Sequence, residues 1–62
     1  MQLLSNYLSS DNRTAEVYVN NNGVYYVGFS TNAKVVFWKT YVDLDVAEDQ
    51  AEDWVQGELS ES

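Results

Sequence analysis

The sequence contains neither cysteine nor histidine, and each absence removes a class of site. Without cysteine, the 62-residue chain has no disulfides and no thiolate metal ligands. Without histidine, it lacks the commonest zinc ligand and the commonest general base. A domain this short buries only about 60% of its unfolded surface, so its stability alone is marginal. Oligomerisation or a well-packed aromatic core remains as the route to a stable structure.

Basic residues are also scarce, with three Lys and Arg against ten Asp and Glu and a net charge of −7. Arg13, Lys34 and Lys39 are scattered along the chain, whereas binding to nucleic-acid phosphates needs clustered bases. The same charge disfavours an anionic membrane surface and is compatible with a basic protein partner. In the simplest interpretation, the acids serve only to keep the protein in solution.

Long hydrophobic runs are missing as well. No apolar run approaches the roughly 20 residues that a bilayer-spanning helix needs. The first residues have no basic region and no sustained apolar core, so we expect no signal peptide and an intracellular, cytoplasmic protein. With 45% hydrophobic and 15% aromatic residues, the chain is too apolar to be disordered. One folded domain over residues 1–62 is expected.

No arrangement of residues points to catalysis. Ser and Thr occur without a His or Cys partner, so no nucleophile–base–orienter set can be assembled. A glycosidase-type carboxylate pair needs a cleft that 62 residues hardly form. Gly23, Gly28 and Gly57 do not make a phosphate-binding loop. We therefore expect a protein that is not an enzyme and that uses no cofactor, no metal and no small-molecule substrate.

The clearest local pattern is a β-hairpin over residues 15–29. Two runs rich in Val, Tyr and Phe, which favour strands, flank three asparagines and Gly23. A two-residue loop ending at Gly23 would place Val17 opposite Gly28. A three-residue loop with Gly23 left-handed would place Val17 opposite Val27 and gather the apolar residues on one face. Because a slip of one residue turns a strand over, burial should select the three-residue loop.

A helix is predicted over residues 46–56. Asp45 is the expected N-cap, Glu48 its capping-box partner, and Gly57 the left-handed stop. At about 100° per residue, the apolar positions share one arc and the acids share the opposite arc. Residues 58–62 should fray. The helix is therefore amphipathic, with a single tryptophan as its anchor in a sheet.

These elements predict an α+β fold, an antiparallel β-meander of three to four strands with one C-terminal amphipathic helix packed on one face. Strands are expected over residues 14–20, 24–30 and 34–42. Residues 2–9 have helical spacing but no cap, and we interpret them as a first strand, with a helix as the alternative. The predicted core consists of Val17, Val19, Tyr25, Val27, Phe29, Trp38, Ala51, Trp54 and Val55.

The orientation of the strand at residues 34–42 has two solutions, because this segment is apolar on both faces. Either Phe37 and Tyr41 or the residues that alternate with them face the helix. Keeping Lys39 in solvent favours the second solution and turns Phe37 and Tyr41 outward. The residues left inside are then Val36, Trp38 and Val42.

The succession of an Ala-Glu-Val-Tyr-Val strand at 15–19, a tyrosine-rich strand and a short helix with the sequence Ala-Glu-Asp-Gln-Ala-Glu-Asp-Trp at 47–54 resembles small uncharacterised proteins of tailed phages of marine cyanobacteria. The resemblance covers most of the chain. It implies no activity, and it transfers no functional residues to this sequence.

An aromatic sheet face is the first candidate interaction site. One short helix covers only one face of a sheet, so the other face should show an apolar patch larger than monomers usually expose. Tyrosine and tryptophan are enriched at interface hot spots, which indicates self-association, with a dimer favoured, or a protein partner. Alternatively, residues 1–9 cover this face or the tyrosine hydroxyls keep it soluble. The residues expected on it are Tyr18, Val24, Tyr26, Phe37 and Tyr41.

The acidic helix face, formed by Glu48, Asp49, Glu52 and Asp53, is the second candidate. A solvated face is the simplest interpretation, and a basic protein partner or mimicry of nucleic acid are the functional ones. The loop at 43–45 is too short for a calcium site. Three hypotheses follow: an interaction protein, a charge-mimic inhibitor of a nucleic-acid-binding protein, or an aromatic nucleic-acid-binding module. The last has too few basic residues for phosphate contacts.

Overall fold

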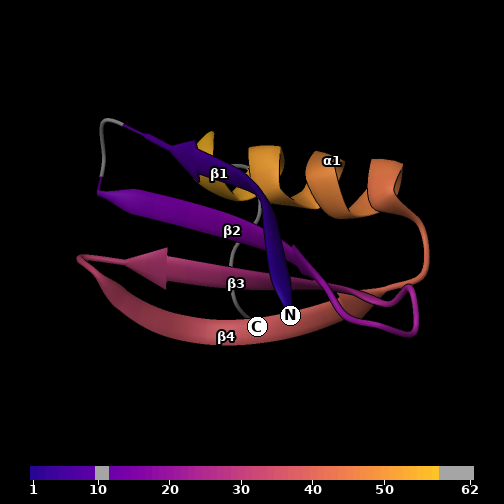
Figure 1. The fold of residues 1–62 in the computed structure, drawn as a ribbon. Coiled ribbons are helices and arrows are strands. Elements are labelled where there is room, and N and C mark those ends of the chain that lie inside the picture. The colour runs from indigo at the N-terminus through magenta and orange to yellow at the C-terminus, as the bar shows by residue number, and fades with distance from the viewer. Residues whose placement is uncertain (10–11, 58–62) are drawn as a thin grey trace.

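The computed structural model describes residues 1–9 and 12–57. Four strands form one antiparallel sheet in chain order, and a helix packs on one face of it (Figure 1). This confirms the predicted α+β meander in its four-stranded form, with a strand rather than a helix at the N-terminus. The tail predicted to fray, residues 58–62, lies outside the described residues. The elements are β1 (Gln2–Leu8), β2 (Arg13–Val19), β3 (Tyr25–Thr31), β4 (Lys34–Tyr41) and α1 (Leu44–Val55).

The hairpin between β2 and β3 has the three-residue loop. Val17 lies opposite Val27, as this loop requires. Gly23 adopts a left-handed φ of 78°, and the backbone N–H of Asn20 donates to the carbonyl of Val24 at 3.0 Å. The Asn20 side chain also accepts from the N–H of Val24 at 3.0 Å. The asparagine-rich segment therefore closes the turn with its side chains as well as its backbone.

Trp54 stands at the centre of the core and contacts three strands. Its ring centroid lies 5.5 Å from those of Phe29 and Phe37. Its indole N–H donates to the carbonyl of Ser30 at 3.0 Å. From β2, the Arg13 guanidinium lies 4.5 Å from the Trp54 ring and donates to the Trp54 carbonyl at 3.1 Å. A cation on the last carbonyls of a helix also suits the helix dipole. The buried apolar residues are Ala15, Val17, Val27, Phe29, Ala47, Ala51 and Trp54.

The helix begins two residues earlier than predicted. Its N-cap is Asp43, whose carboxylate accepts from the N–H of Asp45 at 3.0 Å, so the prediction of Asp45 as the cap was wrong. Leu44 packs against the core, and this contact is compatible with a first helical turn that starts closer to the end of β4. The predicted stop is confirmed, since Gly57 has a φ of 82° and its N–H donates to the Trp54 carbonyl at 3.1 Å.

A β-bulge at Val36 inverts the predicted orientation of β4. On one side of the bulge Ser30 pairs with Val35, and on the other Phe29 pairs with Phe37. The extra residue shifts the alternation by one position, so every later side chain of the strand changes face. Phe37 and Tyr41 therefore face the helix, and the prediction that turned them outward was wrong.

The same bulge places Trp38 and Lys39 on the faces opposite to those expected. Trp38 is 49% exposed and lies on the face away from the helix, so it is not part of the core. Lys39 lies on the helix side, opposite Val27, yet it stays exposed because β4 is an edge strand. Its ammonium group sits 5.8 Å from the Phe37 ring centroid. Its long aliphatic stem lets the charge reach solvent beside a packed aromatic ring.

Candidate interaction face

The sheet face away from α1, here called the open face, is not covered by any described element (Figure 1). Its residues follow from the strand registers, because side chains alternate between the two faces. Four of its apolar members are about half exposed or more: Leu3 at 48%, Trp38 at 49%, Val35 at 50% and Leu8 at 71%. The open face comprises Leu3, Asn6 and Leu8 of β1, Thr14, Glu16 and Tyr18 of β2, Tyr26, Gly28 and Ser30 of β3, and Val35, Trp38 and Thr40 of β4.

An aromatic platform forms at the centre of the open face. Trp38 pairs with Gly28 across β3 and β4, and its indole lies directly over that glycine. A Cβ at position 28 would approach the indole ring to 2.9 Å. The missing side chain lets the indole reach over β3 to Tyr18 on β2, with ring centroids 5.9 Å apart and an interplanar angle of 44°. Burial raises the pKa of Tyr18 above its usual value of 10.0, with the nearby Glu16 carboxylate as a second cause.

Tyr26 extends the platform and is held in place by the hairpin loop. The side-chain N–H of Asn20 donates to the Tyr26 hydroxyl at 3.2 Å, while the same side chain accepts from the loop backbone. The ring is thus fixed at both ends, and its hydroxyl can still donate to a partner. A side chain already ordered in the free protein loses less conformational entropy on binding.

The structure brings together two of the five residues expected on the aromatic face. Tyr18 and Tyr26 are neighbours on the open face, paired across β2 and β3. Phe37 and Tyr41 lie on the opposite face, for the reason given above. Leu3 and Trp38 join the open face instead, and sequence reasoning missed both. Leu3 is adjacent to the bulge at Leu4, and Trp38 lies two residues beyond the bulge at Val36; a bulge leaves no clear signal in the sequence.

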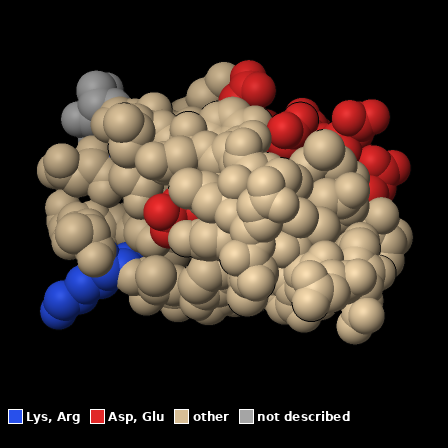
Figure 2. All heavy atoms as spheres, in the orientation of Figure 1, with Lys and Arg blue, Asp and Glu red and all other residues tan. Residues whose placement is uncertain are grey.

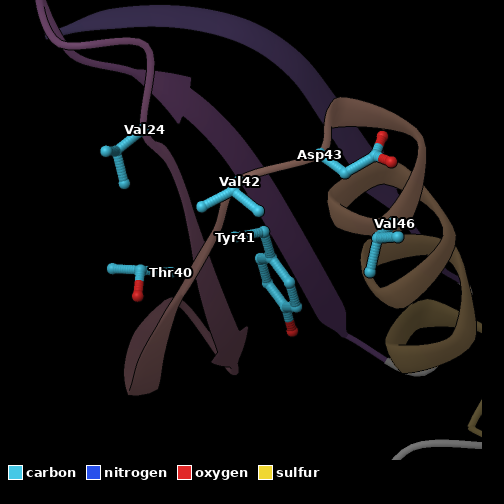
Figure 3. Close-up of a pocket in the computed structure, with 6 residues that line it drawn as sticks. All are labelled: Val24, Thr40, Tyr41, Val42, Asp43 and Val46. Atoms are coloured by element: carbon cyan, nitrogen blue, oxygen red, sulfur yellow. The ribbon is translucent and has the colours of Figure 1, made fainter.

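Val24 lines a hollow at one end of the sheet, apart from the aromatic platform. The hollow is open to solvent, has a volume of about 330 Å³ and lies where β4 turns into α1 (Figure 3). Three valines from different segments surround it, and Asp43 supplies its one charged group. Tyr41 also lines the hollow, although its hydroxyl is buried. The lining residues are Val24, Thr40, Tyr41, Val42, Asp43 and Val46.

The buried hydroxyl of Tyr41 has no hydrogen-bond partner among the described residues. Leaving a buried hydroxyl unsatisfied costs about 1–3 kcal/mol, whereas an apolar group of the same shape avoids this penalty. We expect Tyr41→Phe to raise the free energy of unfolding by about 1 kcal/mol, measured by urea denaturation. Tyr25→Phe is the matched control, since Tyr25 pairs with Tyr41 and shares its face. A less stable Tyr41→Phe protein would contradict the orphaned state of the hydroxyl.

The same residue predicts how stability responds to alkali. Burial raises the pKa of Tyr41 above its usual 10.0, so this phenol ionises more readily in the unfolded chain than in the folded one. Below pH 10 the phenol is neutral in both states and its ionisation has no effect on stability, whereas the free energy of unfolding falls as the pH rises above 10. Wild type should therefore lose more stability between pH 9 and 11 than Tyr41→Phe does. This comparison isolates Tyr41 from Tyr7 and Tyr18, whose pKa values burial also raises.

Acidic residues gather over α1, on the other side of the sheet from the open face (Figure 2). The predicted acidic surface is present there, although its four members are not equivalent. Asp49 and Glu52 are exposed, whereas Asp53 is half buried. Glu48 is half buried too, and its carboxylate accepts from the Ser5 hydroxyl of β1 at 3.2 Å. Part of this surface thus fastens the helix to the first strand.

Comparisons with known protein families, with curated proteins and with solved structures give no match to this chain. The site therefore has to be interpreted from its own geometry. In residues 1–9 and 12–57, no three Asp and Glu side chains lie close enough together to hold a metal ion. The described part of the chain also has no helix of the length and apolarity needed to cross a membrane.

Proposed function

We propose that the protein is a small acidic, non-enzymatic interaction protein that binds a protein surface through its open face, either that of another copy or that of a different protein. The observation that carries this proposal is the aromatic platform of Tyr18, Tyr26 and Trp38 on a sheet face that no described element covers. A half-exposed tryptophan clustered with two partly exposed tyrosines is characteristic of a binding hot spot. Apolar residues scattered singly over a surface are common and do not indicate a binding site.

The chemistry of the open face favours a protein partner over a nucleic acid. All three basic residues of the chain are described, and none belongs to the open face. Arg13 contacts Trp54 on the helix side, and Lys39 lies on that side too. Stacking of bases on aromatic rings is normally accompanied by a basic groove that follows the phosphates. The open face offers the rings without that groove.

Tyr26→Glu is the variant that tests the proposal. It places a charge within the platform, and we expect it to weaken association by tenfold or more, since a buried unpaired charge costs several kcal/mol. Self-association is measured by size-exclusion chromatography with light scattering, and binding of other proteins by retention on the immobilised chain. Gln50→Glu adds the same charge on α1 and should leave both unchanged. Circular dichroism checks that each variant is folded.

The same assay distinguishes binding through the open face from the second candidate function, charge mimicry. This candidate is supported by Glu48, Asp49, Glu52 and Asp53, which lie together on the helix that faces away from the platform. Retention of basic proteins that survives Tyr26→Glu and disappears as the salt concentration rises would support charge mimicry and contradict the open face as the binding site.

A further inference from the structure

We propose that the partner of the open face is a second copy of this chain, stacked sheet against sheet about a two-fold axis. This inference rests on the proposed function and narrows it to one occupant. Three features of the structure support it: the form of the sheet edges, the distribution of charge, and the size of the open face.

The edges of the sheet are poorly suited to pairing with another chain. Edge strand β1 has a bulge at Leu4, and edge strand β4 has one at Val36. A bulge leaves one residue unpaired and twists the strand away from a flat register. Two of the chain's three basic residues, Lys34 and Lys39, also lie on β4, and lysines at an edge discourage strand addition. Association is therefore directed to the face of the sheet.

The distribution of charge favours stacking through the open face. At neutral pH, Glu16 is the one charged residue among those of the open face, although the chain as a whole carries −7. Stacked sheets lie about 10 Å apart, and each helix would lie on the outer side of its own sheet. The acidic helices would then be separated by well over the screening length of about 8 Å at physiological salt. Contact between the helix faces would instead bring the acids together.

The open face is large enough for a weak dimer. Four strands spaced about 4.8 Å apart and about seven residues long outline a face of roughly 450 Å². Two such faces remove about 900 Å² in outline, and the uneven surface of the side chains adds to this area; the total lies below the roughly 1,200 Å² of stable specific interfaces and in the range of weak, transient ones. A dimer of this size should dissociate on dilution. An isologous two-fold contact needs no second kind of surface, because each platform packs on its own copy.

Glu16 gives the proposal its test. It lies on the open face directly opposite Gly28, in the row that Trp38 covers, so stacking would remove its carboxylate from water beside the same group of the second copy. Both effects oppose association. We expect Glu16→Gln to lower the dimer dissociation constant by about fivefold or more, measured by sedimentation equilibrium. Glu52→Gln removes the same charge from the exposed side of α1 and should change the constant by less than about twofold.

A second measurement uses the unmodified protein. In ¹⁵N-edited NMR spectra recorded over a dilution series, we expect concentration-dependent shifts at Leu3, Tyr18 and Trp38, with little change at Asp49 and Glu52. Equal tightening by both glutamine variants, or shifts confined to α1 or to the strand edges, would overturn the stacked dimer. A protein that stays monomeric up to millimolar concentration would overturn it too. The proposed function would survive that result if a different protein were retained and Tyr26→Glu released it.

Discussion

Trp54→Ala is expected to abolish the cooperative unfolding transition of this protein. Removing a core tryptophan costs about 3–5 kcal/mol through lost transfer energy and the cavity left behind. A 62-residue domain has a total stability of about 3–9 kcal/mol at 0.05–0.15 kcal/mol per residue. This cost is comparable to the total stability, and it equals the whole of it at the lower end of the range. We would follow it by circular dichroism during thermal and urea unfolding.

The expected loss exceeds that of an ordinary core residue because Trp54 joins the helix to three strands at once. It is 2% exposed, and its ring contacts Phe29 and Phe37 edge to face. Its removal would leave the carbonyl of Ser30 without the indole N–H and would deprive Arg13 of the ring beneath its guanidinium. The matched control is Trp38→Ala, which removes the same side chain from the opposite face. A Trp54→Ala protein as stable as this control would contradict the proposed anchor.

Phe37→Ala and Trp38→Ala form the second test, since these neighbours lie on opposite faces of β4. Phe37 stacks on Phe29 with ring centroids 4.6 Å apart and meets Trp54 at 5.5 Å. We expect Phe37→Ala to cost about 3 kcal/mol, close to the values for buried aromatics. Trp38 is half exposed, so its loss should cost about 1 kcal/mol.

The order of the two melting temperatures is the measurement that decides between the two orientations of β4. A 1 kcal/mol difference shifts the melting temperature of a domain this small by about 4–8 °C, so the two variants should be clearly resolved. A lower melting temperature for Trp38→Ala would restore the orientation expected from the sequence. It would also contradict the bulge at Val36.

The hairpin and the end of the helix could be predicted because a local residue type determines each of them. Gly23 tolerates the positive φ that the turn needs, and burial of Val17 with Val27 then selects the register. Gly57 ends the helix for the same backbone reason. The helix follows from its periodicity, whereas the first strand was only one of two interpretations, because residues 2–9 have helical spacing.

The face of β4 could not be predicted, because it depends on one inserted residue rather than on composition. Without the bulge at Val36, the two-residue turn between β3 and β4 would have placed Trp38 opposite Val27, inside the protein. The position of Lys39 pointed to the same wrong solution, since a lysine on the helix side was assumed to be buried. At an edge strand that assumption fails, because a long side chain can pass beyond the helix into water. For this reason Phe37 and Tyr41 were wrongly predicted to lie on the open face.

The separation of the two tryptophans into opposite layers gives the molecule two independent optical probes. Trp54, enclosed by aromatic rings, emits from an environment that changes when the chain unfolds. Trp38, half exposed over Gly28, emits from a surface that changes when the open face is covered. A soluble quencher reaches the second indole and not the first while the protein is folded. Folding and surface coverage can therefore be followed in one unlabelled sample, as two distinct components of its fluorescence.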